Sequence, residues 1–174
     1  TYGSAADFLD QINDLRVGCV LTDVRMPGID GLTLQRALQA RGSRLPVIVM
    51  TGHGDVPLAV EALKTGATDF LEKPFDTDRL LATIQAALDA NQAARQQDLA
   101  RAGIVERLES LTKREREVLD KLVEGLPNKT IAFDLGTSPR TVEVQRARVM
   151  EKMGARSLPD LVRMVIAVAQ PPMT

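Results

Sequence analysis

The sequence predicts two domains of different fold class, an α/β domain with a parallel sheet followed by an all-α domain. In the first half, apolar runs of strand length alternate with stretches whose apolar residues recur at helical spacing. This alternation is typical of a parallel sheet covered by helices. After about residue 90 only short, capped helical segments follow, and the net charge changes from −4 over 1–90 to +3 over 112–174. Such a split indicates different partners, with the basic part as the candidate for nucleic acid.

Three strands and four helices are expected in the first half of the chain. The first two strands are continuous apolar runs, as expected for strands buried on both faces of a sheet. The strands are Val17–Leu21, Pro46–Met50 and Asp69–Leu71. Helical spacing, a capping box at the first helix and a glycine after the third define the helices. They are Ser4–Ile12, Gly31–Ala40, Val56–Thr65 and Thr77–Ala90.

The second half is expected to be helical throughout. The segment 91–111 is rich in Ala, Gln and Arg, which favours a solvated helix that extends the preceding one as a linker. Four start signals then predict a compact four-helix domain. They are the Thr112–Glu115 capping box, Asn128 as an N-cap, Ser138 followed by Pro139, and the Ser157–Asp160 capping box. The expected domain boundaries are therefore 1–90, 91–111 and 112–174.

Composition narrows the class of protein further. The chain of 174 residues has one cysteine and one histidine, so neither zinc nor thiol chemistry is indicated. No apolar run reaches the roughly 18–20 residues that span a bilayer, and no secretory signal is visible. We therefore expect a cytoplasmic protein that does not contact a membrane.

Three polar side chains follow the predicted strands of the first half, namely Asp23, Thr51 and Lys73. The carboxyl ends of parallel strands share one edge of the sheet, and ligands bind there. An aspartate at this edge can accept a phosphoryl group if a lysine and a hydroxyl bind the phosphoryl oxygens. Phosphohydrolases with a strand-end D-x-D-x-T pattern are disfavoured because Arg25 takes the second carboxylate position. We expect no enzymatic activity.

Two long stretches, TDVRMPGIDG and VIVMTGHGDVPLAVEALKTGATDFLEKPF, together with the helical C-terminal part, resemble FixJ-like two-component response regulators. The resemblance implies a receiver domain with a flavodoxin-like parallel sheet, followed by a LuxR-type helix-turn-helix domain of four helices. It also implies a role for four residues of the receiver. Asp23 is the phospho-acceptor, Thr51 the switch hydroxyl, Lys73 the phosphate-binding lysine and Phe70 the aromatic switch residue.

The same resemblance implies a Mg²⁺ ion bound by Asp23, by the backbone carbonyl of Arg25 and by an acidic pair. That pair is absent, together with the first strand, first helix and second strand of the family's receiver, which would all precede Thr1. We expect a piece of a longer protein, with a degenerate receiver as the alternative. Asp30 and Asp55 are not expected to replace the acidic pair as Mg²⁺ ligands. Mg²⁺ binding and phosphorylation should therefore be weak in the chain as it stands.

The resemblance also implies a dimer interface on the helix Val56–Thr65. Val60 and Lys64 lie on one face of that helix, and an ordinary core position is the alternative for Val60. His53 lies in the preceding loop, where nothing in the sequence pairs with it, so we expect a loop residue and not a catalytic one.

The helix expected over Arg140–Met153 has two distinct faces. Val142, Val149 and Met153 share one face by their spacing, and polar or small side chains lie opposite, which suits a helix in the major groove of DNA. Among these side chains, the carboxylate of Glu143 is expected to accept a hydrogen bond from cytosine, and Val144 and Ala147 to contact thymine methyls. The basic and polar side chains are expected to bind phosphates. The candidate DNA contacts are Lys129, Thr130, Arg140, Thr141, Glu143, Val144, Gln145, Ala147 and Arg148.

These observations and the resemblance together predict a transcriptional activator controlled by phosphorylation. A FixL-like sensor histidine kinase would phosphorylate Asp23, and the resulting homodimer would bind promoter DNA and act with RNA polymerase on nitrogen-fixation or microaerobic genes. Two alternatives remain. One is a FixJ-like regulator of another pathway, such as aromatic catabolism. The other is a protein-interaction module that sequesters partners and does not bind DNA.

Overall fold

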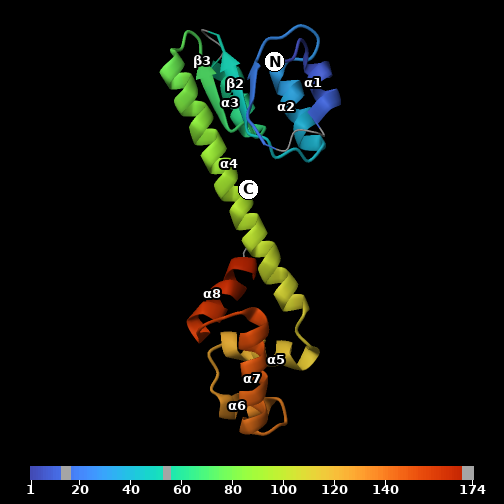
Figure 1. Ribbon diagram of the computed structural model, residues 1–174, viewed down its shortest axis with the longest axis vertical. Coiled ribbons are helices and arrows are strands. Elements are labelled where there is room, and N and C mark those ends of the chain that lie inside the picture. The colour runs from blue at the N-terminus through green and yellow to red at the C-terminus, as the bar shows by residue number, and fades with distance from the viewer. Residues whose placement is uncertain (13–16, 53–55, 170–174) are drawn as a thin grey trace. The chain divides into compact units, whose positions relative to one another are not determined.

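The computed structural model describes residues 1–12, 17–52 and 56–169, so His53 and Asp55 lie outside the described residues (Figure 1). The chain divides into two compact units, Thr1–Arg95 and Gln96–Thr174, and the helix α4 contributes to both. In the part of the chain that the structure describes, no helix is both long and apolar enough to cross a bilayer.

The first unit is built on a parallel sheet with the strand order β1-β2-β3. The strands are β1 (Val20–Asp23), β2 (Val47–Thr51) and β3 (Asp69–Glu72). Four helices accompany them, namely α1 (Ala5–Gln11), α2 (Gly31–Ala40), α3 (Val56–Lys64) and α4 (Thr77–Glu109). The α/β class and the parallel arrangement predicted from the sequence are confirmed.

Two hydrophobic clusters cover the two faces of the sheet. On one face, side chains of α1, α2 and α3 pack against Val20, Val47 and Val49. On the other face, Ala87 and Ile84 of α4 pack against Ile48 and Leu71. The central strand β2 is therefore buried on both sides, as predicted.

The prediction of burial on both faces is wrong for β1. The strand begins at Val20, three residues later than predicted, and Val17 is 80% exposed. Leu21 is 37% exposed, because β1 is the outer strand of the sheet. On the face of the sheet where Leu21 lies, α4 packs against Ile48 of β2 and Leu71 of β3 and does not cover β1. Among the described residues, β1 pairs with β2 alone.

The second unit is an all-α domain, again as predicted. The final part of α4 is followed by four helices whose buried residues form one core around Leu119, Leu122, Ile131, Val142 and Val149. These helices are α5 (Lys113–Val123), α6 (Asn128–Asp134), α7 (Pro139–Met153) and α8 (Leu158–Ala169). A single helix crosses the segment 91–111 as far as Glu109, which agrees with the expected helical extension.

Most of the predicted helix starts are present. Thr112 and Glu115 form a complete capping box, and Ser138 caps α7 by accepting from the Thr141 amide at 3.1 Å. The N-cap prediction for Asn128 is wrong, because Pro127 takes that position and provides no side-chain bond. Asn128 is instead the first helical residue, and its carboxamide oxygen accepts from Arg146 at 3.5 Å.

Candidate functional site

The structure places the three residues predicted at the carboxyl edge of the sheet close together. Asp23 ends β1, Thr51 ends β2, and Lys73 follows β3 directly. Lys73 Nζ forms an ion pair with Asp23 Oδ2, and the Lys73 amide donates to the Thr51 carbonyl at 2.8 Å. The side chains of Asp23 and Lys73 are partly exposed, so the carboxylate is accessible to a reactant from solvent.

The loop after β1 holds Asp23 in place. The Arg25 amide donates to Asp23 Oδ1 at 3.2 Å. Gly31 packs against the backbone of Asp23 so closely that a Cβ would lie 2.3 Å from the Asp23 carbonyl oxygen. Only glycine fits this approach. Sequence reasoning missed the constraint, although the Asp-Gly pair that opens α2 is a signal for it.

Asp30 is committed to capping α2. Its carboxylate accepts from the Thr33 amide at 2.7 Å, and this hydrogen bond holds the pKa of Asp30 below its usual value. The carboxylate therefore stabilises the start of the helix that packs behind the Asp23 loop.

Thr51 and Phe70 lie on the same face of the sheet, on the neighbouring strands β2 and β3. Phe70 pairs in register with Val49, two residues before Thr51, so both side chains point to the same face. Thr51 is 2% exposed, whereas Phe70 is half-buried. A half-buried aromatic side chain and a buried hydroxyl therefore share one face at this edge, and their role as a switch stays a prediction.

The helix α3 presents the two residues predicted at the dimer interface. Val60 is 44% exposed, which contradicts the alternative of an ordinary core position, and Lys64 is exposed. Leu63, which is also partly exposed, adds to the apolar surface of this helix.

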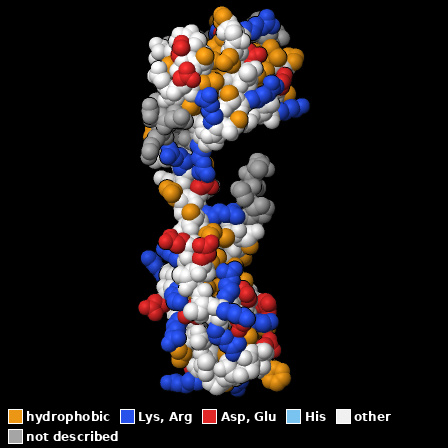
Figure 2. All heavy atoms as spheres, turned by 90° about the vertical axis from the view of Figure 1, so that its right-hand side faces the viewer, with side chains coloured by type: hydrophobic (Ala, Val, Ile, Leu, Met, Phe, Trp, Pro, Cys, Tyr) orange, Lys and Arg blue, Asp and Glu red, His pale blue; other side chains and the backbone are white. Residues whose placement is uncertain are grey.

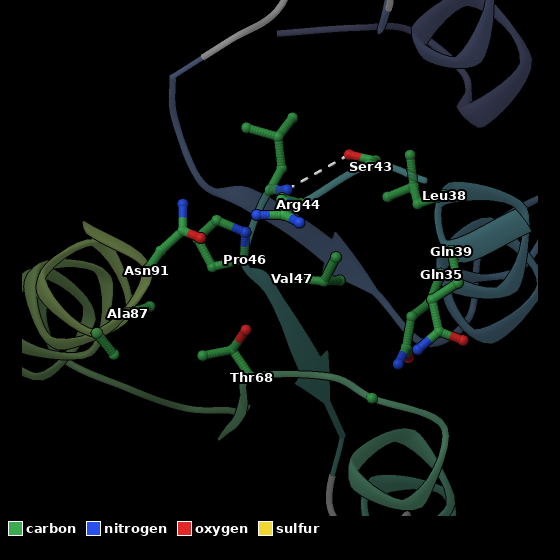
Figure 3. A pocket seen from close by; sticks show the side chains of 13 residues that line it. Gln35, Leu38, Gln39, Ser43, Arg44, Pro46, Val47, Thr68, Ala87 and Asn91 are labelled. Atoms are coloured by element: carbon green, nitrogen blue, oxygen red, sulfur yellow. Dashed lines mark hydrogen bonds between the residues drawn. The ribbon is translucent and has the colours of Figure 1, made fainter. Parts of the chain in front are cut away.

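A cavity of about 350 Å³ lies at the opposite edge of the sheet, at the amino ends of β2 and β3. Figure 3 shows Gln35, Leu38 and Gln39 on one side of it, Ala87 and Asn91 on the other, and Pro46, Val47 and Thr68 between. Gln35 and Gln39 already donate to the carbonyls of Ala62 and Thr65, at 3.2 and 2.6 Å. This cavity is separate from the Asp23 edge.

In the second unit, α7 has the two faces that the sequence predicts. Val142, Val149 and Met153 are fully buried. The exposed residues include all the candidate DNA contacts except Gln145, namely Lys129, Thr130, Arg140, Thr141, Glu143, Val144, Ala147 and Arg148. Gln145 is half-buried, and its amide oxygen has no hydrogen-bond partner in the described part of the chain.

The basic residues of this unit differ in their pairing. Arg114, Arg116, Lys121 and Lys152 all form ion pairs with carboxylates. Within the described residues, no ion pair involves Lys129, Arg140 or Arg148. Figure 2 shows acidic and basic side chains mixed over the visible face of this unit. Phosphate contacts would therefore depend on these individual cations and not on a uniformly basic surface.

Sequence reasoning missed a cluster at the end of α7. Lys152 Nζ lies 2.6 Å from Oε2 of the buried Glu115, and Arg107 Nη1 donates to the Met153 carbonyl at 3.0 Å. The residues involved are up to 46 positions apart, so no local pattern in the sequence could have indicated their contact.

Comparison with known proteins agrees with these two units. Residues 1–85 match the response regulator receiver domain, and residues 109–165 match the bacterial regulatory proteins of the luxR family. The transcriptional regulatory protein FixJ of Azorhizobium caulinodans is 58% identical over 169 residues, which cover 97% of this chain and 80% of that protein. The chain belongs to the FixJ-like response regulators.

Other members of the response regulators are also similar to this FixJ-like chain. The response regulator protein TodT of Pseudomonas putida strain F1 is 43% identical, over 93% of this chain and 71% of its own length. The solved structure of the response regulator StyR has a TM-score of 0.81 and 40% identity, and the match covers 95% of this chain and 84% of that one. The receiver and LuxR-type fold predicted from the sequence is therefore confirmed.

Receiver domains generally bind Mg²⁺ for phosphorylation. The Mg²⁺ ligands that the FixJ resemblance implies within this chain are Asp23 and the carbonyl of Arg25. The described residues include no group of three His, Cys, Asp or Glu side chains that could hold a metal ion. Asp30 is engaged at the start of α2. The described residues therefore do not by themselves fit a Mg²⁺ site.

Proposed function

We propose that a sensor histidine kinase phosphorylates Asp23 and that this modification promotes binding of the chain to promoter DNA. The receiver would occupy residues 1–90, the helical linker 91–111 and the DNA-binding domain 112–174. The observation that carries the proposal is the meeting of Asp23, Lys73 and Thr51 at one edge of the sheet. A strand-end carboxylate that is held by a lysine and open to solvent suits phosphoryl transfer.

In the proposed reaction, an oxygen of Asp23 forms a bond to phosphorus as the bond to the kinase histidine breaks. Lys73, which now pairs with the carboxylate, would then neutralise charge on the phosphoryl oxygens. The Thr51 side chain would move toward the phosphoryl group and donate a hydrogen bond from its hydroxyl to a phosphoryl oxygen. The Phe70 side chain would then turn into the space that Thr51 leaves. These steps are a two-state repacking biased by local charge.

The output of this change would be dimerisation. The exposed side chains of Val60 and Lys64 lie on α3, which packs against both β2 and β3. A homodimer formed through this face would place two DNA-binding domains on one promoter. Two linked domains bind a double site more tightly than one domain does, because the second contact becomes intramolecular.

In DNA binding, the exposed face of α7 would enter the major groove. Glu143 would accept from cytosine, and Val144 and Ala147 would contact thymine methyls. Arg140 and Arg148, which form no ion pair within the described residues, would bind phosphates, together with Lys129 and Thr130 at the start of α6. The half-buried Gln145 would reach a phosphate only after its side chain turns outward.

The physiological role that best matches the FixJ resemblance is activation of nitrogen-fixation or microaerobic genes with RNA polymerase. The kinase would then be FixL-like. Response regulators with names other than FixJ, among them TodT and StyR, also match this chain, so control of another pathway is a second candidate. Aromatic catabolism is the example that the sequence resemblance suggests. One further candidate is a protein-interaction module, with a degenerate or truncated receiver, that sequesters partners and does not bind DNA.

Intact-mass measurement tests the central step. The full chain and its Asp23→Asn variant are incubated with acetyl phosphate and Mg²⁺, and each is then assayed for retention on promoter duplexes. Because the acidic pair is absent, we expect only part of the unmodified chain, and none of the Asp23→Asn variant, to gain one phosphoryl group. The phosphorylated fraction should bind duplexes more tightly. No gain in either protein would show that this chain does not accept phosphate at Asp23.

A further inference from the structure

The end of the linker helix α4 and the end of α7 hold each other reciprocally. Arg107 of α4 donates from Nη1 to the Met153 carbonyl at 3.0 Å. In return, Lys152 of α7 donates from Nζ to the carbonyl of Ser110, just after α4, at 3.2 Å, and pairs with Glu115 of α5. We call these five residues, Arg107, Ser110, Glu115, Lys152 and Met153, the clasp.

The clasp provides a hydrogen-bond donor for a backbone carbonyl that the end of α7 leaves unpaired within the helix. The last carbonyls of α7 have no partner within the helix, and the helix dipole makes this end negative. The guanidinium of Arg107, which binds the Met153 carbonyl, supplies both a hydrogen-bond donor and a positive charge at this end of the helix. The site is also tightly built, because Gly154 takes a left-handed conformation with φ 66° and a Cβ there would lie 3.2 Å from Arg107 Nη1.

The buried carboxylate of Glu115 makes the second half of the clasp specific. Its side chain is 4% exposed and accepts from both Lys152 at 2.6 Å and the Thr112 amide at 2.8 Å. A carboxylate buried to this extent is stable only when it is paired and hydrogen-bonded. Lys152 is therefore confined to one position, and with it the last turn of α7.

From this geometry we infer that Arg107 is a positioning residue for DNA recognition. The inference rests on the proposed DNA-binding function. In its middle, α7 is held by α6 through the Arg146–Asn128 hydrogen bond at 3.5 Å, and at its end it is held by the clasp. With its middle and its end held, the face of α7 that carries Glu143 and Ala147 has one orientation. Because α4 is the covalent connection to the receiver, the clasp also joins that connection directly to the DNA-contacting helix.

The same helix offers a matched control. Arg101 of α4 donates from Nη2 to the Val168 carbonyl of α8 at 2.9 Å. It has the same charge as Arg107 and also donates to a carbonyl near the end of a helix, but that helix is α8. Loss of Arg101 removes an equivalent bond without releasing α7.

The test compares Arg107→Ala and Arg101→Ala in the full chain. The probes are a duplex that the unmodified chain selects from a random-sequence pool and a shuffled duplex of equal length and composition. We expect Arg107→Ala to lower the affinity for the selected duplex about tenfold and that for the shuffled duplex less than twofold, a loss equivalent to one bidentate base contact. Arg101→Ala should keep the discrimination ratio within about twofold of the unmodified chain.

The discrimination ratio separates positioning from general destabilisation, because partial unfolding lowers both affinities equally. If Arg107→Ala unfolds at the assay temperature, Arg107→Met retains the apolar stem, removes every donor and should show the same loss of discrimination. Normal discrimination in the folded variant, or an equal loss in Arg101→Ala, would overturn the inference. If the unmodified chain binds neither duplex, the proposed DNA-binding function itself is wrong.

Discussion

The ammonium group of Lys73 forms an ion pair with the carboxylate of Asp23, at the edge where β1 and β3 flank the end of β2. Both side chains are partly exposed, so the pair contributes little to stability. Its value lies in placing a cation where a phosphoryl group on Asp23 would need one.

Replacement of Lys73 by Met should therefore separate function from stability. The free energy of unfolding should change by less than about 1 kcal/mol, because an exposed pair is screened by solvent. The yield of phosphorylated chain with acetyl phosphate should fall about tenfold or more, because a charged donor to the phosphoryl oxygens is lost. Urea denaturation and intact mass measure the two effects.

Arg36→Met is the control for that experiment. Arg36 forms an ion pair of similar exposure with Glu61 at 2.7 Å, between α2 and α3 and away from Asp23. It should leave the phosphoryl yield unchanged. An equal loss of yield in both variants would contradict the assigned role of Lys73.

The fold was predictable where local pattern and burial coincide. The run at β2 is apolar, and β2 is the central strand, so both of its faces are covered. The run at β1 looks equally apolar, but its burial depends on which elements flank it in space. Sequence pattern has no access to that information, and the prediction for Leu21 was therefore wrong.

The candidate site shows the same division. Asp23, Thr51 and Lys73 were predictable because strand ends in a parallel sheet share an edge. The clasp was not, because it joins residues distant in sequence through backbone carbonyls. The apolar Phe133 is 87% exposed, because the seven-residue helix α6 buries only Ile131 and Ala132.

Glu115 predicts a pH dependence of stability. The hydrogen bond from Lys152, followed by that from the Thr112 amide, holds the pKa of Glu115 below its usual value. A carboxyl whose pKa is lowered on folding stabilises the folded state above its unfolded pKa, and the contribution is lost as the pH falls through the folded pKa. The contribution should be complete above about pH 4.3 and decline below it.

The variant Glu115→Gln isolates that contribution. At pH 7 it should lower the free energy of unfolding by about 1–3 kcal/mol, because a charge-assisted hydrogen bond is weakened. The difference from the unmodified chain should shrink as the pH falls below about 4.3. Urea denaturation from pH 7 to pH 3 measures it. A difference that stays constant over this range would show that Glu115 is not stabilised as a carboxylate.

Two valines of α7 should behave in opposite ways. Val149 is fully buried, so Val149→Ala should lower the free energy of unfolding by about 1.5–3 kcal/mol through lost burial and a cavity. Val144 is exposed, so Val144→Ala should change it by less than about 0.5 kcal/mol. Only the exposed valine should affect preference for thymine in bound duplexes. Thermal unfolding and duplex selection distinguish them, and a destabilising Val144→Ala would contradict the exposed placement.

The salt dependence of DNA binding should identify the phosphate contacts. Each neutralised phosphate contributes about 0.9 to the negative slope of log affinity against log salt concentration. Replacing both Arg140 and Arg148 by Ala should therefore reduce the slope by about two units and weaken binding to all duplexes alike. Arg163→Ala provides the control, because Arg163 lies on α8 and pairs with Asp160 at 3.7 Å.

Glu143→Gln should keep the slope and change the preferred base, because a carboxylate that accepts from cytosine makes no phosphate contact. An unchanged slope in the double arginine variant would exclude these two residues from the DNA interface, and an unchanged base preference in Glu143→Gln would exclude that carboxylate from the groove.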